Sequence, residues 1–551
     1  MVNQFPPIKL DTNSKSSTDF NPAVRTFGRR FFADQTISEV LLEFLLVATS
    51  PKKIGEQHTS VGSYFPNRES LRCWPEFEPL RYSPKARLNL KLFSFLSASK
   101  LETRHKSHRQ QYLILMSEMK SSENLNVSDS INPDDILKTL ENLFLGFQSV
   151  GGQRTWCAQA FLPIAENMLA AETLWNETQA RRDEVSDWES VLQRFTRYFS
   201  YDQHRFLARG GELLYLQICN CFRQDTETVE SWLGELGWYS ANERDPVELQ
   251  KQVEVAITEV FRATPDTINK LATFIDTGVD ESTSRETDFT NGLPRYSTCG
   301  WCPPESWKEG LFFAIELTRI CKAVIDPIER IELLEIACAM QMLRSLCAQS
   351  VRYTRDENDS ESHFAGPLGY VWAISDPAGQ HNAVKQISRR NVNAIQRLIH
   401  DAIRHPDILN DYKSDAERSN AYREADRRYG HKLFLTVAKR LGLIVPRQGS
   451  GARFVLNERV LRYLVLSTIR PGERVTYDSF KQLLYTHHGL AVDESLIGRS
   501  CRWSGTTQLT TLGGNVDRWL LEMLDASGML IRLSDSCSLV ENPFGNGVAK
   551  V

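Results

Sequence analysis

The sequence lacks the glycine-rich motifs with which many proteins bind nucleotide phosphates. It contains no Gly-x-x-x-x-Gly-Lys-Ser/Thr segment and no Gly-x-Gly-x-x-Gly turn. Such motifs place backbone amides and a helix start around the phosphates. Their absence argues against an ATPase and against a dinucleotide-dependent enzyme.

Long hydrophobic runs are also missing. The most apolar stretch, 40–48, contains Glu43 and is much shorter than the roughly 20 residues of a membrane-spanning helix. Residues 1–15 are polar and lack the apolar core of a secretion signal. The 11 cysteines are odd in number and scattered, unlike the disulfide framework of a secreted domain. We therefore expect a cytoplasmic protein with no membrane contact.

An overall excess of basic charge is absent too, since the net charge is -4. The average hides an asymmetry, because residues 385–462 contain 17 Lys and Arg against 8 Asp and Glu, a net charge of +9. The remainder of the chain therefore carries -13. This distribution favours a polyanion-binding segment within an otherwise acidic protein.

Apolar residues recur at helical spacing along most of the 551 residues, which predicts a mainly α, multi-domain protein. Polar gaps and Pro-containing loops mark the expected boundaries. We expect a flexible N-terminal tail at 1–22, an N-terminal helical domain at 23–125, a central helical domain at 132–280, a helical-hairpin domain at 290–380, a basic helical segment at 381–456 and a C-terminal winged helix at 457–551.

The last hundred or so residues have the element order of a winged helix, three helices followed by a β-hairpin. Apolar residues within 460–466 define the first helix, while Thr476 is a predicted N-cap and Gly489 a predicted stop for the second. After a loop, Asn515 is expected to cap the third helix, and 529–540 form the hairpin. This order indicates nucleic acid, although winged helices also serve as protein-docking modules.

The segment 427–456 has a similar pattern. A helix is predicted at 432–441, followed by Gly442, the turn 446–451 and a strand at 453–456. The sequence is therefore compatible with two winged helices in tandem, each carrying a short hairpin.

Basic side chains of these segments are the predicted nucleic-acid-binding residues, because Arg pairs well with phosphate. They are Arg389, Arg390, Arg397, Arg404, Arg423, Arg427, Arg428, Lys432, Lys439, Arg440 and Arg518. The alternative is a solvated helix surface on which these cations pair with neighbouring acids such as Asp401, Glu424 and Asp426. Because Arg518 is surrounded by acidic residues, the upstream segment has to supply most of the charge.

Cys299 and Cys302 have the two-residue spacing of a zinc half-site. A complete site needs two more ligands, and the other close pair, Cys219 and Cys221, has a spacing that points to different faces of a predicted helix. We therefore expect no cofactor, with zinc at Cys299 and Cys302 as the alternative. The adjacent His487 and His488 are expected in a loop and exposed to solvent.

Two segments carry a resemblance to known proteins. They are Gly-Gly-Gln-Arg-Thr-Trp-Cys at 151–157 and Phe-Leu-Ala-Arg-Gly-Gly-Glu-Leu-Leu-Tyr at 206–215. With the predicted winged helix, they resemble uncharacterised accessory proteins of multi-gene bacterial anti-phage defence systems, such as Druantia, phosphorothioation-dependent restriction or methylation-associated defence. The resemblance implies a subunit that works beside a helicase, ATPase or nuclease, and it supplies no catalytic residues.

The leading hypothesis is a non-catalytic scaffold or adaptor whose C-terminal part binds DNA and whose larger acidic part docks the partner helicase/ATPase or nuclease. One alternative is a metal-dependent nuclease or a zinc-containing enzyme of the same system. Another is a pure protein–protein interaction module, in which the basic segment contacts an acidic partner.

Overall fold

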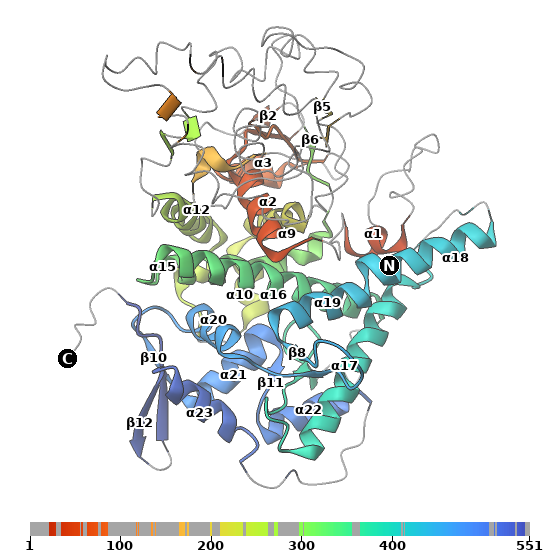
Figure 1. Cartoon of the computed structure of the whole chain (residues 1–551), viewed down its shortest axis with the longest axis vertical. Helices are drawn as coiled ribbons and strands as arrows, with labels where there is room; N and C mark the ends of the chain where they lie inside the picture. The colour runs from red at the N-terminus through yellow and green to blue at the C-terminus, as the bar shows by residue number, and fades with distance from the viewer. Residues whose placement is uncertain are drawn as a thin grey trace.

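Helices dominate the described part of the chain, so the prediction of a mainly α fold is confirmed. The computed structural model (Figure 1) describes residues 21–28, 35–54, 57–58, 63–74, 79–85, 165–170, 174–175, 199–200, 210–234, 238–262, 297–300, 302–354, 364–408, 414–505, 515–534 and 537–545, with a few isolated positions between them. Most of the predicted N-terminal tail and the segment 151–157 lie outside these residues.

A group of long helices forms the centre of the molecule. They are α2 (Ile37–Thr49), α9 (Gly210–Phe222), α12 (Pro246–Arg262), α15 (Trp307–Lys322) and α16 (Pro327–Thr354), and they pack against one another (Figure 1). The predicted helical hairpin is present as α15 and α16. Asp326 Oδ1 accepts a hydrogen bond from the backbone N–H of Ile328 at 2.9 Å, which caps the start of α16.

Two glycines let three of these helices cross with their backbones in contact. A Cβ at Gly211 on α9 would lie 2.3 Å from the backbone nitrogen of Phe44 on α2. A Cβ at Gly310 on α15 would lie 2.1 Å from the carbonyl oxygen of Gln217 on α9. A side chain at either position would force the helices apart, so the close stacking of α2, α9 and α15 requires glycine there.

Short strands join the N-terminal region to the residues before α15. β1 (Lys52–Ile54), β2 (Gln57–His58), β3 (Arg81–Tyr82) and β6 (Ser297–Thr298) form an antiparallel sheet in the order β2-β1-β3-β6. The remaining short elements of this half are α1 (Pro22–Phe27), α3 (Arg68–Arg72), η4 (Glu166–Met168), β4 (Leu174–Trp175), β5 (Phe199–Ser200), α10 (Thr226–Leu233), α11 (Ala241–Arg244) and η6 (Pro304–Ser306).

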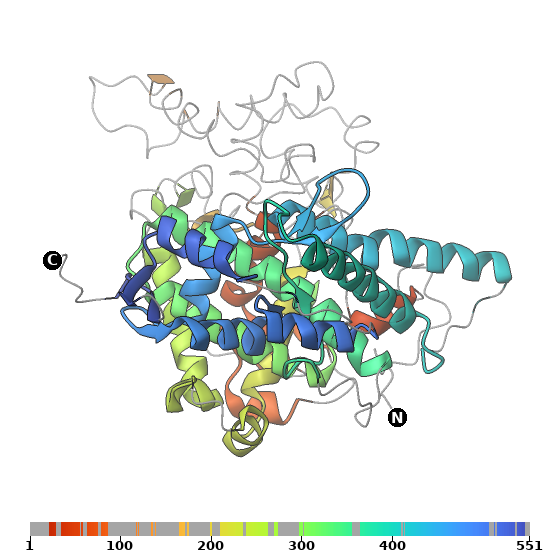
Figure 2. The same cartoon turned by 90° about the horizontal axis from the view of Figure 1, so that it is seen from below.

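The basic segment folds as helices followed by a hairpin. It comprises α17 (Asn382–Ile403), α18 (Asp415–Glu424), the π-helical turn η8 (Ala425–Tyr429), α19 (His431–Leu441), β8 (Ile444–Val445) and β9 (Arg453–Phe454). Gly442 ends α19 in the left-handed conformation, with φ of +75°. As predicted, the helix at 432–441 is followed by a hairpin, in which β8 and β9 are antiparallel. Helix α18 extends away from the body (Figures 1 and 2).

The C-terminal region contains the predicted helices and hairpin, and one further helix. Its elements are α20 (Glu458–Thr468), β10 (Arg474–Thr476), α21 (Tyr477–His488), β11 (Leu490–Ala491), α22 (Glu494–Trp503), α23 (Arg518–Ala526), β12 (Leu530–Ser534) and β13 (Cys537–Glu541). The strands β10, β13 and β12 form an antiparallel sheet in that order. As predicted, the side chain of Thr476 caps α21, and Gly489 ends it.

Two details of this region differ from the prediction. Helix α22 occupies part of the expected loop, because Asp493 caps its start and its apolar side chains are buried. Asn515 does not cap α23, which begins after Asp517; the carbonyl of Asn515 instead accepts the N–H of Arg518 in the preceding turn.

A continuous apolar core links these regions. It includes buried residues from Ala23 to Val540. The short strand β7 (Trp372–Ala373) pairs with β11 in parallel, and Ile374 bridges to Phe454 of β9. The domain boundaries expected at 380/381 and 456/457 stay predictions. In the structure, residues on both sides of each boundary pack into the shared core. Within the described ranges, no helix is both long and apolar enough to cross a bilayer.

Candidate functional site

A fully buried polar cluster lies where α15, α16 and α21 meet. Its members are Glu316 on α15, Arg344 on α16, and His487 and His488 at the end of α21, all at most 1% exposed. The prediction that the two histidines are exposed in a loop is wrong. Helix α21 continues through His488 before Gly489 ends it, and this last turn packs into the core.

Glu316 is the acceptor at the centre of the cluster. Its Oε1 lies 2.8 Å from His487 Nε2, and its Oε2 accepts a hydrogen bond from the hydroxyl of Tyr463 at 2.7 Å. Arg344 forms a hydrogen-bonded ion pair with the same carboxylate. The charge of Glu316 is therefore balanced and its two oxygens are hydrogen-bonded, as a buried carboxylate requires.

Hydrogen-bond partners define one consistent tautomer for each histidine. A carboxylate can only accept, so His487 Nε2 donates to Glu316, and His487 Nδ1 accepts from the Tyr239 hydroxyl at 2.9 Å. Arg344 can only donate, so His488 Nδ1 accepts from it at 3.1 Å. Both imidazoles are then neutral. Burial lowers the pKa of each histidine well below its ordinary value.

One carboxylate and two imidazoles are also a common ligand set for divalent metals. In the described part of the chain, Glu316, His487 and His488 are the group of potential ligands that lie close enough together. However, the guanidinium of Arg344 contacts both Glu316 Oε1 and His488 Nδ1. It thus occupies the position where a metal cation would meet these two ligands. The contacts fit a hydrogen-bonded core better than a metal centre.

Tyr239, His487 and Glu316 are ordered as a hydroxyl, an imidazole and a carboxylate, which is the order of a nucleophile-activating relay. Catalysis would also require that substrate reach the hydroxyl. Tyr239 is 4% exposed, and burial raises the pKa of its hydroxyl above the ordinary tyrosine value. The relay is closed to solvent, so we assign it a structural role.

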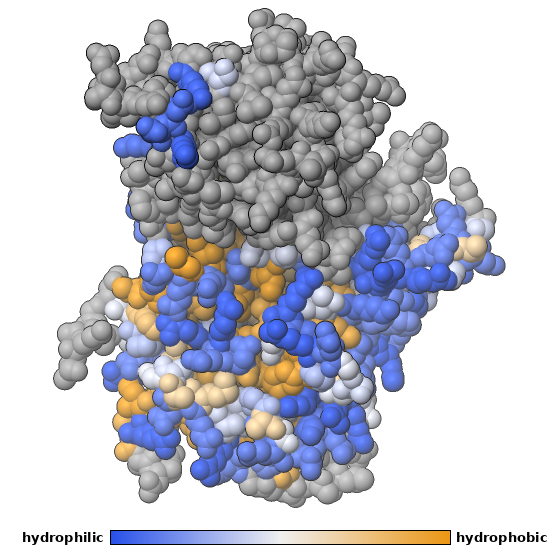
Figure 3. Space-filling view, viewed as in Figure 1, coloured by the Kyte–Doolittle hydropathy of each residue, from blue (hydrophilic) through white to orange (hydrophobic). Residues whose placement is uncertain are grey.

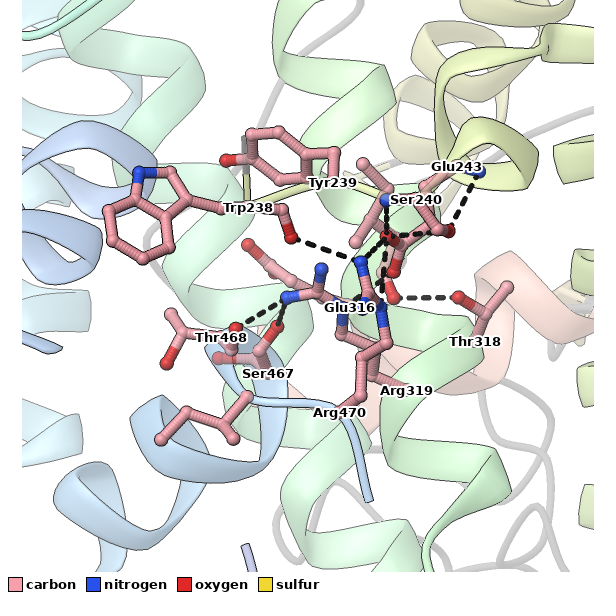
Figure 4. Close-up of polar contacts among 12 residues, drawn as sticks. Trp238, Tyr239, Ser240, Glu243, Glu316, Thr318, Arg319, Ser467, Thr468 and Arg470 are labelled. Atoms are coloured by element: carbon pink, nitrogen blue, oxygen red, sulfur yellow. Dashed lines mark hydrogen bonds and ion pairs between the residues drawn. The ribbon is translucent and has the colours of Figure 1, made fainter. Parts of the chain in front are cut away.

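A second ion-pair group fixes the C-terminal region to the central helices (Figure 4). Arg319 on α15 donates from Nε to Glu243 at 2.7 Å and from Nη1 to the carbonyl of Thr468 at 2.6 Å. Arg470 donates to the other oxygen of Glu243 at 3.2 Å. Burial opposes ionisation of Glu243, but Arg319 and Arg470 outweigh it and lower the pKa to about 2. The end of α20 is thereby attached to α15 and α11.

The cysteine pair of the zinc prediction lies between β6 and α15. Cys299 is buried, and Cys302 Sγ is 3.0 Å from the hydroxyl of Ser306. Burial raises the pKa of the Cys302 thiol, which opposes the thiolate form that zinc requires. As predicted, Cys219 and Cys221 lie inside a helix, α9. Among the described residues, neither pair belongs to a group of three close metal-ligating side chains.

On the outside, the predicted nucleic-acid-binding residues fall into three groups. The first group is paired within the chain. Arg404 binds Asp426 at 2.6 and 3.0 Å, Arg428 binds Glu424 at 3.3 Å, Arg440 donates to the carbonyl of Gln35, and Arg518 binds Glu522 at 2.9 Å. For these residues, the observed contacts match the alternative prediction, a solvated surface on which the cations pair within the chain.

The second group is exposed on α17. Arg389, Arg390 and Arg397 are exposed, and Arg390 and Arg397 share a stripe with the exposed Gln386 and Asn393. Between 386 and 397 this stripe contains no acidic residue, and Asp401, one turn further along, is exposed on the same side. The opposite face of α17 is apolar and packs against α16 and β9. The helix therefore presents its cations from a fixed backbone.

The hairpin turn 446–451 adds a cation beside α17. Residues 446–450 are exposed, and Arg447 is the cation in this turn. Arg389 Nε donates to the carbonyl of Gly451 at 3.3 Å, which joins the turn to the helix. We call Arg389, Arg390, Arg397 and Arg447 the basic face. Figure 3 shows mainly hydrophilic side chains over the side of the molecule that carries α17 to α19.

The third group comprises the remaining predicted cations. Arg423, Arg427 and Lys432 are exposed and Lys439 is half-buried, on α18, η8 and α19. Arg447 was not among the predicted nucleic-acid-binding residues, although its turn was predicted. Nor were Arg499 and Arg502 on the unpredicted helix α22, which are exposed and stack over Tyr485 and Phe364.

Helix α22 packs against α17. The polar cluster around Glu316 is thus buried inside the molecule, whereas the basic face is exposed to solvent.

Comparisons with protein families, with curated proteins and with solved structures find no match to this chain.

Proposed function

We propose that this protein is a non-catalytic scaffold that binds nucleic acid through the segment 381–456. The proposal rests mainly on the exposure of the basic face. Its four arginines are exposed on one side of α17 and in the adjoining turn, and no acidic residue lies between Arg390 and Arg397 in the stripe of α17. Exposed arginines on a rigid helix can pair with phosphates and release condensed counterions.

The element order supports two winged-helix modules. In the segment 381–456, helices α17, α18 and α19 precede the hairpin β8–β9. In 457–551, helices α20, α21 and α23 precede the hairpin β12–β13, and β10 completes the sheet. Both arrangements follow the order of helices and then a hairpin that the sequence predicts, with α22 added in the second.

The two proposed modules differ in charge, and this assigns them different partners. Helix α19 carries Lys432, Lys439 and Arg440 with no acidic residue, whereas α23 carries Arg518 with Glu522 and Asp525. A helix facing phosphates has to be basic. We therefore assign nucleic acid to the first module and a protein partner to the second.

The partner and the biological setting follow from the sequence resemblance. An accessory subunit of a cytoplasmic anti-phage defence complex would bring DNA to a helicase/ATPase or nuclease encoded separately. A non-catalytic role agrees with the closed relay around Glu316 and with the absence of nucleotide-binding motifs in the sequence.

Fluorescence anisotropy with the full-length chain tests the proposal. Wild-type protein is titrated against labelled DNA and RNA oligonucleotides over a salt series, next to the double variant R390E/R397E. We expect binding that weakens steeply with salt, and a log–log salt slope that is smaller by roughly 2 in the double variant, about 1 for each lost phosphate contact. The control is R518E, which changes an exposed arginine on the acidic helix α23.

Absence of binding at low salt would overturn the proposal and favour a pure protein–protein interaction module. An unchanged salt slope in R390E/R397E would show that another surface carries the contact. Plasmid cleavage in magnesium or manganese would favour the nuclease alternative over a scaffold.

A further inference from the structure

The basic face offers cations but no free aromatic ring. Among the described residues, no Phe, Tyr or Trp side chain with an assigned burial is exposed. The most exposed rings described in the basic segment are Tyr412 and Tyr422, which are half-buried. Arg404 and Arg418 lie over the ring of Tyr422, at 5.0 and 6.0 Å from its centroid, so this ring already has cationic partners from its own chain.

Exposed arginines without exposed aromatic rings indicate which kind of nucleic acid can bind to the basic face. Proteins that bind single strands stack the unpaired bases on aromatic side chains, in addition to contacting the phosphates. A double strand keeps its bases stacked internally, so phosphate contacts can suffice to hold it. A surface of arginines without exposed rings therefore suits a duplex better than a single strand.

The spacing of the cations on α17 points in the same direction. Arg390 and Arg397 are seven residues apart, two turns of helix, which places their Cα atoms roughly 10 Å apart along the axis. This distance is close to the width of about 12 Å of the major groove of B-form DNA. A helix lying across that groove would direct one arginine to each bordering strand.

The packing of α17 against its neighbours supports such a contact. Val392, Ile395 and Ile399 on its buried face are fully enclosed, and Asn391 binds the backbone of β7 from the same face. The Cα atoms of the two arginines are therefore held at a fixed spacing before any ligand arrives. A rigid spacing favours a regular double helix, whose phosphates also have fixed positions.

We propose that the basic face binds double-stranded DNA in preference to single strands, with Arg390 and Arg397 contacting phosphates on opposite sides of the major groove. This inference rests on the proposed function and specifies its ligand. Double-stranded RNA fits less well, because the major groove of A-form RNA is deep and narrow.

Competition binding with the full-length chain tests the inference. A labelled 20-base-pair DNA duplex is displaced by unlabelled duplex DNA, by single-stranded DNA of the same sequence and by duplex RNA, at one salt concentration. We expect duplex DNA to compete at least tenfold better than either alternative. In R390A/R397A this ratio should fall towards one, because the loss affects duplex binding most. R518A should keep the wild-type ratio.

The outcomes separate this inference from the proposed function. Single-stranded DNA or duplex RNA that competes as well as duplex DNA would overturn the preference while leaving nucleic-acid binding intact. Loss of affinity for all three ligands by the same factor in R390A/R397A would overturn the two-strand contact. No binding of any ligand would overturn both proposals.

Discussion

Arg344 on α16 and Glu316 on α15 form an ion pair in the centre of the molecule, with 1% and 0% of the side chains exposed. Each charge has been removed from water and is balanced by the other and by hydrogen bonds from Tyr463 and to His488. Such a pair need not add stability relative to apolar residues, but either partner alone would be an uncompensated buried charge.

Replacing Arg344 alone should therefore be strongly destabilising. We expect R344M to lose about 3–5 kcal/mol of unfolding free energy, because Glu316 would keep a buried charge without its cation. The double variant R344M/E316L should recover much of this loss. Urea denaturation followed by circular dichroism measures both, and equal stability of R344M and wild type would contradict the interpretation.

Acidification should weaken the fold through His487 and His488. Burial lowers the folded-state pKa of both, so the unfolded chain binds more protons once the pH falls below about 6.5. Their stabilising contribution is complete above pH 6.5 and is lost as the pH falls towards the lowered folded pKa values. Each imidazole can contribute a slope of up to about 1.4 kcal/mol per pH unit.

Urea midpoints between pH 7.5 and 5 measure this effect. The pKa of His431 is lowered too, so this histidine adds a dependence of the same sign, whereas Glu243, with a folded pKa of about 2, acts only below about pH 4.3. The variant H487Q/H488Q should show a flatter dependence between pH 6.5 and 5, with H431Q as the control. An unchanged slope in H487Q/H488Q would rule out the buried pair as its origin.

The helix crossing at Gly310 should not tolerate a methyl group. Because a Cβ there would lie 2.1 Å from the carbonyl oxygen of Gln217, G310A has to displace α15 from α9. We expect a loss of about 1–3 kcal/mol or more, as for other overpacked cores. G449A provides a comparison, since its Cβ has open space and meets only the cost of a positive φ of +91°. Thermal unfolding should show a larger loss of stability in G310A than in G449A. A smaller loss in G310A than in G449A would be inconsistent with the crossing.

A fragment that starts at residue 381 should fail to fold cooperatively. It would lack β7, which pairs with β11, and it would leave His487 and His488 without Glu316 and Arg344. Thermal unfolding of 381–551 should give no sharp transition by circular dichroism. A cooperative transition comparable with that of the full chain would instead support an independent domain.

The local elements of the C-terminal half were predictable because their signals lie within a few residues. Thr476 caps the helix that it precedes, Gly489 ends it, and Gly442 separates α19 from its hairpin. Each depends on hydrogen bonds between groups up to five residues apart in the chain. Helix α22 was missed because its short apolar stripe lay within a segment read as a loop.

The candidate site depended on contacts between distant residues. The net charge of 385–462 identified the basic segment, but only folding shows that Arg404 is paired with Asp426 while Arg390 and Arg397 share an exposed stripe. Arg447 joins them because the turn packs beside Arg389. Pairing and exposure depend on which surfaces meet, and charge counts along the chain do not contain that information.

The sequence by itself determined the helical character, the caps and hairpins near the C-terminus and the concentration of positive charge, because these follow from periodicity and local hydrogen bonding. Only the tertiary structure decided that His487 and His488 are buried and neutral. Their partner Glu316 is 171 residues from His487 in the chain, and burial removes from water the groups that a sequence reading would leave hydrated.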